Sequence, residues 1–542
     1  MSASVDSASQ GAPNEKQVEG ERYDATMAEE SGENLEDYPH GVKLLTLMFA
    51  LCLGVFLVAL DNTIISTAIP RITDQFKSLE DVGWGISATQ LLFGKFYTFF
   101  SIKSVFLIAV SIFEIGSLVC GVAPNSKALI VGRAVAGLGS AGIFTGAFII
   151  IAHAVPLVNR PLYSGLMGAM YGIASVAGPL MGGAFTDKVT WRWCFYINLP
   201  IGAITIVTVA LLFKMPKSAK HKPREVPLTL WQKIQQFDPL GTILFIPGIV
   251  SLLLALQWGG SKYAWGNARI IVLFVIFGVF IAGFVAVQIW QQENATVPPR
   301  IFMKRSIMAG CWFALCLGAT FFIFIFYLPI WFQAIKGTSA VKSGIDNLPM
   351  IFGLVISSII TGIFSTLLGQ YVPFMLASSV LVTVGAGLMS TFTTHTGHSK
   401  WIGYQAIYGL GMGMGMQGPL IAAQTVLDLK DVPVGTSLAM FLQNLGGALF
   451  VSVGQNVFQN KLTSGLVSNV PGVDPAIVFL AGATNLKNAV DPQYLPAVLE
   501  AYNSALVVAF QVGIAMAGIT LLGSLAMEWK SVKGKKIEMG PA

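Results

Sequence analysis

The chain has 542 residues, of which 54% are hydrophobic and only 11% are charged, and its formal net charge is +6. A soluble domain carries about 25% charged residues, so these figures exclude an ordinary water-soluble protein and also a disordered chain. The composition instead predicts an all-α polytopic membrane protein, and the 57 glycines fit the close helix packing that is favoured in lipid.

The chain begins with a polar segment and continues with long apolar runs. Residues 1–42 are rich in Ser, Glu and Asp, and they predict a disordered acidic tail. A membrane-spanning helix needs ~20 predominantly apolar residues. Fourteen candidate runs follow the tail, at 44–67, 81–99, 104–123, 128–153, 162–185, 196–213, 238–257, 269–290, 306–330, 343–366, 372–392, 401–426, 434–455 and 505–527.

The positions of the basic residues predict the orientation of the chain in the membrane. With fourteen spans both termini lie on one side, and most of the 33 Lys and Arg residues then lie on that same side. The bias is strongest in the connection 214–237 and in the tail 528–542. Because cytoplasmic connections carry an excess of Lys and Arg, we expect both termini in the cytoplasm and the long loop 456–504 outside it.

A faint internal repeat divides the chain into halves. The sequence GKFYT at 94–98 resembles GIFST at 362–366, and GLG at 137–139 recurs at 409–411 with nearly the same offset. Two parallel repeats around a central cavity are typical of secondary transporters. The predicted organisation is an acidic tail 1–42, a six-helix bundle 43–213, a basic loop 214–237, two inserted spans 238–290, a six-helix bundle 291–527 and a basic tail 528–542.

Three ionisable residues fall inside predicted spans: Asp61 in the first, Glu114 in the third and Arg133 in the fourth. An Arg within a span costs about 2.5–3.5 kcal/mol on insertion scales, so it is expected to face a partner or water. An Asp beside an Arg can release a proton when the two pair and bind one when they separate. We interpret the three residues as a proton-coupling group; the alternative is that they only fix the packing of the helices.

The fifth run carries small residues at helical spacing together with a proline. Gly172, Gly178, Gly182 and Gly183 let another helix approach closely, and Pro179 removes a backbone hydrogen bond and kinks the helix. A kinked, closely packed helix suits an interface that moves between two halves. The alternative is a static packing groove.

Flexible apolar and neutral amide side chains gather in the twelfth and thirteenth runs. Methionine offers a deformable apolar surface, and amides form hydrogen bonds without fixing the charge of a ligand. These residues predict a cavity for bulky, mostly apolar molecules, although ordinary packing is an equal alternative for each one taken singly. They are Met412, Met416, Gln417, Gln443 and Asn444.

Several other motifs are absent or occur in the wrong context. The sequence contains no phosphate-binding G-x-x-x-x-G-K-[ST] loop and no G-x-S-x-G or H-E-x-x-H motif, so we expect neither an enzyme nor an ATP-driven pump. We expect no metal site and no cofactor, with a proton gradient as the source of energy. The Asn294 sequon lies in a connection predicted to be cytoplasmic, so we expect it to remain unglycosylated.

The motifs together resemble those of a known family. The segments 60–65 (LDNTII), 132–137 (GRAVAG), 178–183 (GPLMGG) and 191–200 (WRWCFYINLP) resemble motifs of the fourteen-spanner drug:proton antiporters of the major facilitator superfamily. The segments 113–118 (FEIGSL) and 443–447 (QNLGG) are similar to fungal members that export toxins and secondary metabolites. The resemblance covers about residues 44–527 and implies the major facilitator fold, with Arg133 linked to proton transfer.

The sequence also departs from the family pattern. The usual loop motif after the second helix, G-x-x-x-D-[RK]-x-G-[RK]-[RK], reads GKFYTFFSIK at 94–103. Thr98 replaces its acid and Ser101 replaces one glycine, which argues against the usual electrostatic latch. The thirteenth run lacks the acid that some relatives use for dicationic drugs, which argues against strongly cationic substrates.

These observations predict proton-coupled efflux of bulky, mostly apolar small molecules such as toxins, drugs or secondary metabolites by alternating access. The alternative is a proton-coupled importer, such as a siderophore or nutrient symporter. The expected partners are a small-molecule substrate, protons and the lipid bilayer, with no nucleic acid, and the chain is expected to work as a monomer. The plasma membrane is the expected location, with a vacuolar or vesicle membrane as the alternative.

Overall fold

The computed structural model describes residues 39–76, 86–213, 236–260 and 263–533. Within these ranges the chain is helical and has no strand, apart from an isolated bridge between Gly259 and Tyr263. The first described helix begins at Gly41, at the end of the predicted acidic tail. The rest of that tail, most of the basic loop 214–237 and the last part of the tail 528–542 lie outside the described residues.

The first group of helices packs around one apolar core. Because their buried faces carry Leu, Val, Ile, Ala and Phe at helical spacing, most of these helices contribute to one continuous cluster of buried side chains. The short 3-10 turn η2 (Leu157–Asn159) leads directly into the helix that begins at Arg160. The helices are α2 (Gly41–Phe76), α3 (Ile86–Phe99), α4 (Ile102–Val122), α5 (Ser126–Ala154), α6 (Arg160–Lys188), α7 (Trp193–Tyr196) and α8 (Asn198–Leu212).

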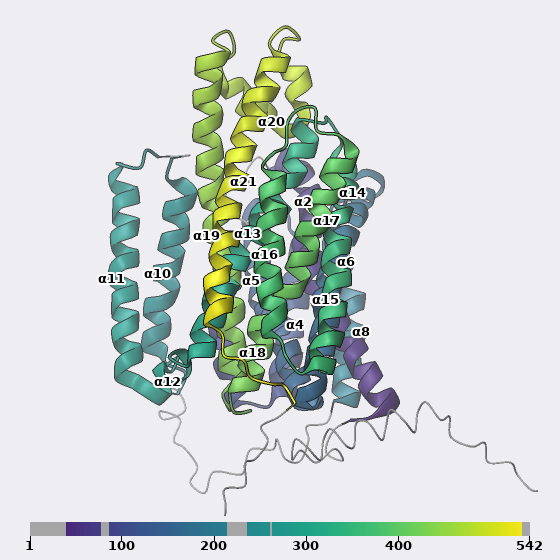
Figure 1. Ribbon diagram of the computed structural model, residues 1–542, viewed down its shortest axis with the longest axis vertical. Helices are drawn as coiled ribbons and strands as arrows, with labels where there is room; N and C mark the ends of the chain where they lie inside the picture. Colours follow the sequence, from purple (N-terminus) through teal and green to yellow (C-terminus); the bar gives the residue numbers. More distant parts are fainter. Residues whose placement is uncertain (1–38, 77–85, 214–235, 261–262, 534–542) are drawn as a thin grey trace, which may run out of the picture.

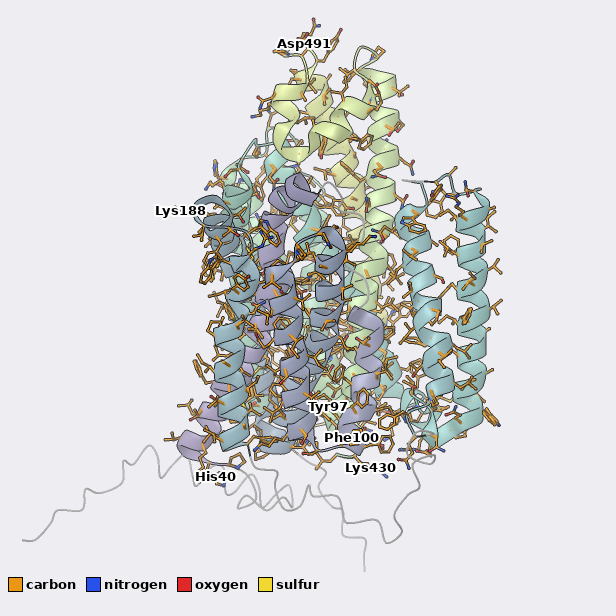
Figure 2. The ribbon with its side chains drawn as sticks, turned by 180° about the vertical axis from the view of Figure 1, so that it is seen from behind. His40, Tyr97, Phe100, Lys188, Lys430 and Asp491 are labelled. Carbon is orange, nitrogen blue, oxygen red and sulfur yellow. The ribbon has the colours of Figure 1, made fainter. Side chains whose placement is uncertain are left out.

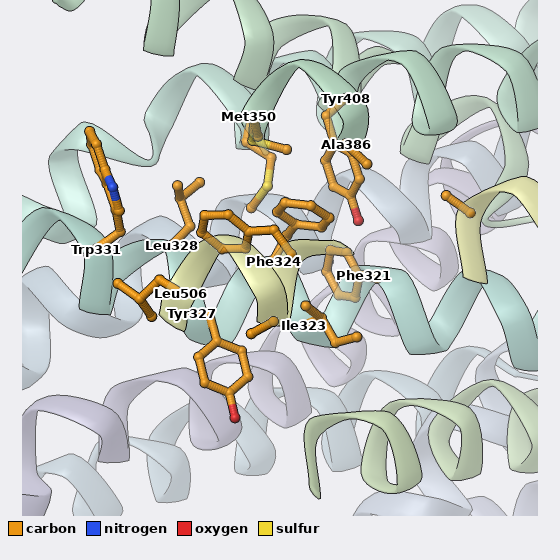
Figure 3. Packing of buried hydrophobic residues seen from close by; sticks show 14 of the residues in the cluster. Phe321, Ile323, Phe324, Tyr327, Leu328, Trp331, Met350, Ala386, Tyr408 and Leu506 are labelled. Carbon is orange, nitrogen blue, oxygen red and sulfur yellow. The ribbon is translucent and has the colours of Figure 1, made fainter. Parts of the chain in front are cut away.

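A second group of helices packs around a core that is rich in aromatic rings. The ring centroids of Phe324 and Tyr408 are 4.7 Å apart, and those of Phe324 and Phe510 are 5.1 Å apart. Figure 3 shows Phe324 and Tyr408 among Leu328, Met350 and their neighbours. The helices are α12 (Pro299–Phe302), α13 (Arg305–Ala334), α14 (Ala340–Asp346), α15 (Leu348–Leu368), α16 (Val372–Met389), α17 (His398–Gly415), α18 (Gly418–Val426), α19 (Val432–Asn469), α20 (Pro475–Ala489) and α21 (Leu495–Ala526).

Two further helices stand beside these groups. Helices α10 (Pro239–Trp258) and α11 (Ala268–Gln291) form an antiparallel pair at one edge of the molecule (Figure 1). Helix α10 packs on α19 through Phe245 and Phe441, whose ring centroids are 5.2 Å apart. Helix α11 leaves most of its apolar surface exposed, as expected of a helix that faces lipid.

Twelve helices of the described ranges are long and apolar enough to cross a membrane. The expected spans 81–99 and 401–426 are not among them. Helix α3 is described over only 14 residues, and the other span divides into α17 and α18 at Met416 and Gln417. Pro419, in the first turn of α18, has no backbone N–H to donate, which favours a helix start at this point.

The segment 456–504, predicted as a long extracytoplasmic loop between spans, is largely helical. Helix α19 continues for 38 residues to Asn469, α20 follows, and α21 already begins at Leu495. At 1.5 Å per residue α19 measures about 57 Å, well beyond the ~30 Å of a bilayer core. Its upper end projects with α20 and α21 past the other helices (Figure 1). Buried Leu462, Leu466 and Leu486 continue the apolar core into this projection, which stabilises helix outside any span.

Candidate functional site

A buried ion pair joins α2 to α5. The Nη1 atom of Arg133 donates to Oδ2 of Asp61 at 2.5 Å, and the two side chains are only 8% and 5% exposed. Neither residue faces lipid, and each supplies the opposite charge that the other needs inside an apolar bundle. The structure therefore brings together two of the three ionisable residues that the sequence singled out.

A neutral amide completes the environment of Asp61. The Nδ2 atom of Asn198, at the start of α8, donates to Oδ1 of Asp61 at 3.2 Å and to Oγ of Ser117 in α4 at 3.2 Å. Asn198 is fully buried. Thus α2, α4, α5 and α8 all contribute side chains to one polar site. The sequence pattern did not identify Asn198 as a site residue, because a neutral amide in a span gives no charge signal.

The turn before α8 is fixed by Arg192 and Trp191, which belong to the same sequence motif as Asn198. The Nη2 atom of Arg192 donates to the carbonyl of Ala123 at 3.0 Å, beyond the end of α4. The Arg192 guanidinium also lies 4.5 Å from the centroid of the Trp191 ring, a cation–π distance. These contacts tie the end of α4 to the start of α8 and so hold Asn198 in register with Ser117.

Glu114 lies near this polar site, but its carboxyl group is not hydrogen-bonded to any described residue. Both oxygens of its carboxyl group are buried, and neither has a hydrogen-bond partner among the described residues. The carboxyl group lies directly against Gly202 of α8, where an added Cβ atom would collide with it. Two more buried polar atoms of the site, Oδ1 of Asn198 and Nε of Arg133, also have no partner in the part of the chain that the structure describes.

The small residues of α6 lie between α2 and the second helix group. A Cβ atom added at Gly178 would collide with Thr63 of α2, and one added at Gly172 would collide with Val355 of α15. The hydroxyl of Thr63 donates to the carbonyl of Ala174 in α6 at 3.0 Å. Glycine is therefore required on both faces of α6, because two helices approach it closely at once.

The C-terminal half of α6 also approaches α14. A Cβ atom added at Gly183 would lie 2.9 Å from Cγ2 of Val341, and Pro179 lies inside α6 opposite Gly344. Gly182 contributes its carbonyl, which accepts a hydrogen bond from the hydroxyl of Thr186. Thus Gly172, Pro179 and Gly183 lie where α6 meets α14 and α15, whereas Gly178 lies against α2.

The predicted substrate-cavity residues do not share one environment. Met412 is fully buried and Met416 is 7% exposed, and both pack within the aromatic core of the second group. In such a core, methionine can fill irregular gaps between rings. Gln417 is buried at the break between α17 and α18, where its side chain faces Gly168 of α6.

The two amides of α19 lie closer to the contact between the helix groups. The Nδ2 atom of Asn444 donates to Oε1 of Gln90 in α3 at 2.9 Å. Gln443 is half-buried, and its backbone carbonyl lies against Gly318 of α13. Gln417 and Asn444 therefore both contact helices of the first group, whereas Met412 and Met416 belong to the interior of the second.

A cluster of charges that the sequence did not predict lies at the end of the molecule marked by Phe100 and Lys430 in Figure 2. The guanidinium of Arg300 bonds both carboxylate oxygens of Asp431, at 2.9 and 3.2 Å, and both of Glu293, at 2.8 and 3.2 Å. These carboxylates raise the pKa of Arg300 above its usual value. The buried Lys95 of α3 donates to the carbonyl of Asn294 at 3.3 Å.

The connection after α11 is held in the same cluster by Asp238. Its fully buried carboxylate accepts from the backbone N–H of Gly241 at 2.7 Å, from Gln288 at 2.6 Å and from both the N–H and the hydroxyl of Thr296 at 2.9 Å. The connection after α11, which Asp238 holds in place, therefore bridges α3 and α19. The hydroxyl of Thr98, in place of the usual acid, donates to the carbonyl of Gly94 in its own helix.

Comparisons with known proteins agree with this architecture. The sequence profile described as Major Facilitator Superfamily matches residues 51–451. The chain is similar to MFS-type efflux pump MFS1 of Arthroderma benhamiae, with 58% identity over 93% of this chain and 94% of that protein. It is 54% identical to efflux pump roqT of Penicillium rubens, over 90% of this chain and 91% of that one. It is 50% identical to efflux pump aflT of Aspergillus parasiticus, over 91% and 97%.

Solved structures extend the comparison at the level of the fold. A bacterial homolog of the human lysosomal transporter Spinster, in an inward-facing conformation, aligns with a TM-score of 0.53 and 15% identity over 90% of this chain and 98% of that one. The human organic anion transporter MFSD10 aligns with a TM-score of 0.55 and 11% identity over 88% of this chain and 100% of that one. The chain therefore belongs to the major facilitator superfamily, and it is a membrane transporter and not an enzyme.

Proposed function

We propose that this transporter exports bulky, mostly apolar small molecules, such as toxins, drugs or secondary metabolites, in exchange for protons. Several relatives at 50% identity or more are named efflux pumps, which supports the direction of transport. The observation that carries the proton coupling is the buried pair of Asp61 and Arg133, enclosed with Asn198 in one polar site. No cofactor enters the proposal, since the proton gradient supplies the energy.

The ion pair gives the site two states of different free energy. Separating a buried pair while both charges remain costs about 3–5 kcal/mol, and a proton bound by an acid of the same polar site offsets part of that cost. A gradient of one pH unit supplies about 1.4 kcal/mol per proton, and a potential of 100 mV adds about 2.3 kcal/mol per charge. These energies are of the same order, so proton binding can drive the change between an inward-open and an outward-open arrangement.

We further propose fourteen spans, arranged as two six-helix bundles with α10 and α11 inserted between them. Helix α3 and the broken pair α17 and α18 supply the two spans beyond the twelve that length and composition identify. The contacts between the helix groups support this arrangement. Helix α6 packs on α15, and α3 packs on α19. The sequence repeat relates α3 to α15, and it therefore also relates α6 to α19. The contact of α6 with α15 and that of α3 with α19 are thus equivalent under the repeat.

The same arrangement supports alternating access within one chain. The hydroxyl of Ser358 in α15 donates to the carbonyl of Gly165 in α6 at 3.0 Å, and Asn444 of α19 bonds Gln90 of α3. Both contacts would change as one bundle tilts against the other. We place the pathway between the two bundles of a monomer, in the plasma membrane, with the end that carries His40 and Lys430 in the cytoplasm (Figure 2).

The test uses the full chain in liposomes and radiolabelled chloramphenicol, a neutral compound with an aromatic ring and hydrogen-bonding groups. An antiporter accumulates the compound in vesicles that are acid inside, about tenfold for a gradient of one pH unit and one proton. A symporter, the importer alternative, accumulates it only when the outside is acid. Accumulation in acid-outside vesicles alone would overturn export, and equal distribution in both would overturn proton coupling.

A further inference from the structure

We propose that Glu114, and not Asp61, is the acid that carries the coupled proton, while Asp61 stays ionised as the partner of Arg133. The inference rests on the proposed proton coupling and assigns the two acids of the polar site different roles. It also makes Asn198 the positioning residue that connects them.

The bonding of Asp61 fits an ionised carboxylate. Its Oδ2 accepts from the guanidinium of Arg133, and its Oδ1 accepts from the amide of Asn198. The guanidinium N–H of Arg133 and the amide N–H of Asn198 can only donate, so each oxygen of Asp61 acts as an acceptor. A hydrogen added to either oxygen would face a donor N–H and would break the bond. Proton binding at Asp61 is therefore opposed by the partners that surround it.

The surroundings of Glu114 fit a neutral carboxylic acid. Its oxygens are buried and accept no hydrogen bond from any described residue. The charged group that acts on it is Asp61 of α2, whose negative charge opposes a second one, and Arg133 of α5 is paired with Asp61. Helix α8 places the uncharged Gly202 directly against it. A carboxylate at this position would lack any compensating partner.

Asn198 connects the neutral acid with the ion pair. Glu114 lies against Gly202, one helical turn from Asn198 on α8, and Ser117, one turn from Glu114 on α4, bonds Asn198 directly. The Oδ1 atom of Asn198 is buried and has no donor among the described residues, so it is an acceptor available to a protonated Glu114. When the site opens to water, the O–H bond of Glu114 breaks, the proton passes to a water molecule and the carboxylate remains.

The first experiment compares Glu114→Gln with the wild-type chain in liposomes. Glutamine keeps the size of the side chain but cannot carry a proton. We expect E114Q to exchange labelled for unlabelled chloramphenicol at equal pH. Under a gradient of one pH unit, the wild-type chain should accumulate the compound roughly tenfold, whereas E114Q should not accumulate it. Glu500→Gln, the same change at an exposed position, serves as the control and keeps full accumulation. Accumulation by E114Q equal to that of the wild type overturns the inference, whereas a wild-type chain that ignores the pH gradient overturns proton coupling itself.

A second measurement does not depend on transport. We expect the infrared spectrum of the wild-type protein to contain the carbonyl band of a buried, protonated carboxylic acid, and we expect Asp61→Asn to retain that band. Loss of the band in E114Q completes the assignment. If D61N loses the band, Asp61 carries the proton and the inference is wrong, even where E114Q fails to fold.

Discussion

Asp61 and Arg133 are 72 positions apart in the sequence, yet Nη1 of Arg133 lies 2.5 Å from Oδ2 of Asp61 in a buried ion pair between α2 and α5. Each residue alone would be costly inside a membrane bundle. Together with Asn198 they form the polar centre of the first helix group, and the predictions below begin with this pair.

Replacing one member of the pair leaves the other as an unpaired buried charge. We expect Asp61→Asn or Arg133→Gln to destabilise the protein by about 3–5 kcal/mol, and the double variant to be more stable than either single one. Thermal unfolding in detergent of all four proteins measures the coupling through a double-mutant cycle. Additive effects of the two changes would show that the pair contributes no specific stability. All three variants should also lose pH-driven transport.

Asn198 is expected to hold the carboxylate of Asp61 in place. Asn198→Ala removes the donor to Asp61 and to Ser117 and leaves buried polar atoms unpaired, which costs about 1–3 kcal/mol. Asn198→Asp should be worse, because it places a second negative charge beside Asp61. Unfolding temperatures in the order wild type, N198A and N198D check this. A stable N198D variant would contradict the placement of these side chains.

The interface role of α6 is tested at Gly178. An added methyl group would collide with Thr63 and Ile64 of α2, and overpacking of this kind costs about 1–3 kcal/mol. Gly178→Ala should therefore lower both the unfolding temperature and the rate of chloramphenicol transport. Gly387→Ala is the matched control, since a Cβ atom there meets nothing within 4 Å. Equal behaviour of the two variants would remove the steric argument.

The charge cluster around Arg300 is expected to stabilise the connection after α11. Its side chain is 42% exposed, which weakens each ion pair, so Arg300→Ala should cost about 1 kcal/mol. Arg300→Lys keeps the charge but loses the fork that bonds two carboxylates, so its effect should be intermediate. Differential scanning of both variants at low and high salt measures this. An R300A protein that unfolds at the wild-type temperature under both conditions would contradict it.

The sequon at Asn294 is predicted to remain unmodified. Its Thr296 is 4% exposed, and both its N–H and its hydroxyl are bonded to Asp238. A glycosidase should therefore cause no change in the mobility of the protein expressed in a eukaryotic cell. A shift that disappears in Asn294→Gln would place this connection on the extracytoplasmic side and would reverse the proposed orientation.

The sequence predicted those features that give a strong local signal. Long apolar runs marked most of the helices, and the rare charges Asp61 and Arg133 marked the polar site, because each is costly in lipid without a partner. Asn198 gave no such signal, since a neutral amide is far less costly in a span. The helices beyond 456 give no long apolar run, because a helix outside the membrane is only half apolar.

Other features depended on contacts that no spacing reveals. The cluster around Arg300 combines residues of α3, the connection after α11 and the start of α19, which only the fold brings together. Met412 and Met416 belong to the buried aromatic cluster of the second group, a neighbourhood that residue type alone does not reveal. A single sequence does not show toward which neighbouring helix each side chain points.

The most direct test of proton-coupled export measures both fluxes in the same vesicles. Liposomes that contain the full chain and trapped pyranine start at equal pH inside and outside, and chloramphenicol is then added outside. Exchange for protons predicts that the interior becomes more alkaline as the compound enters, and that Asp61→Asn abolishes this change. An interior that becomes acid, or that keeps its pH while the compound enters, would contradict proton antiport by this protein.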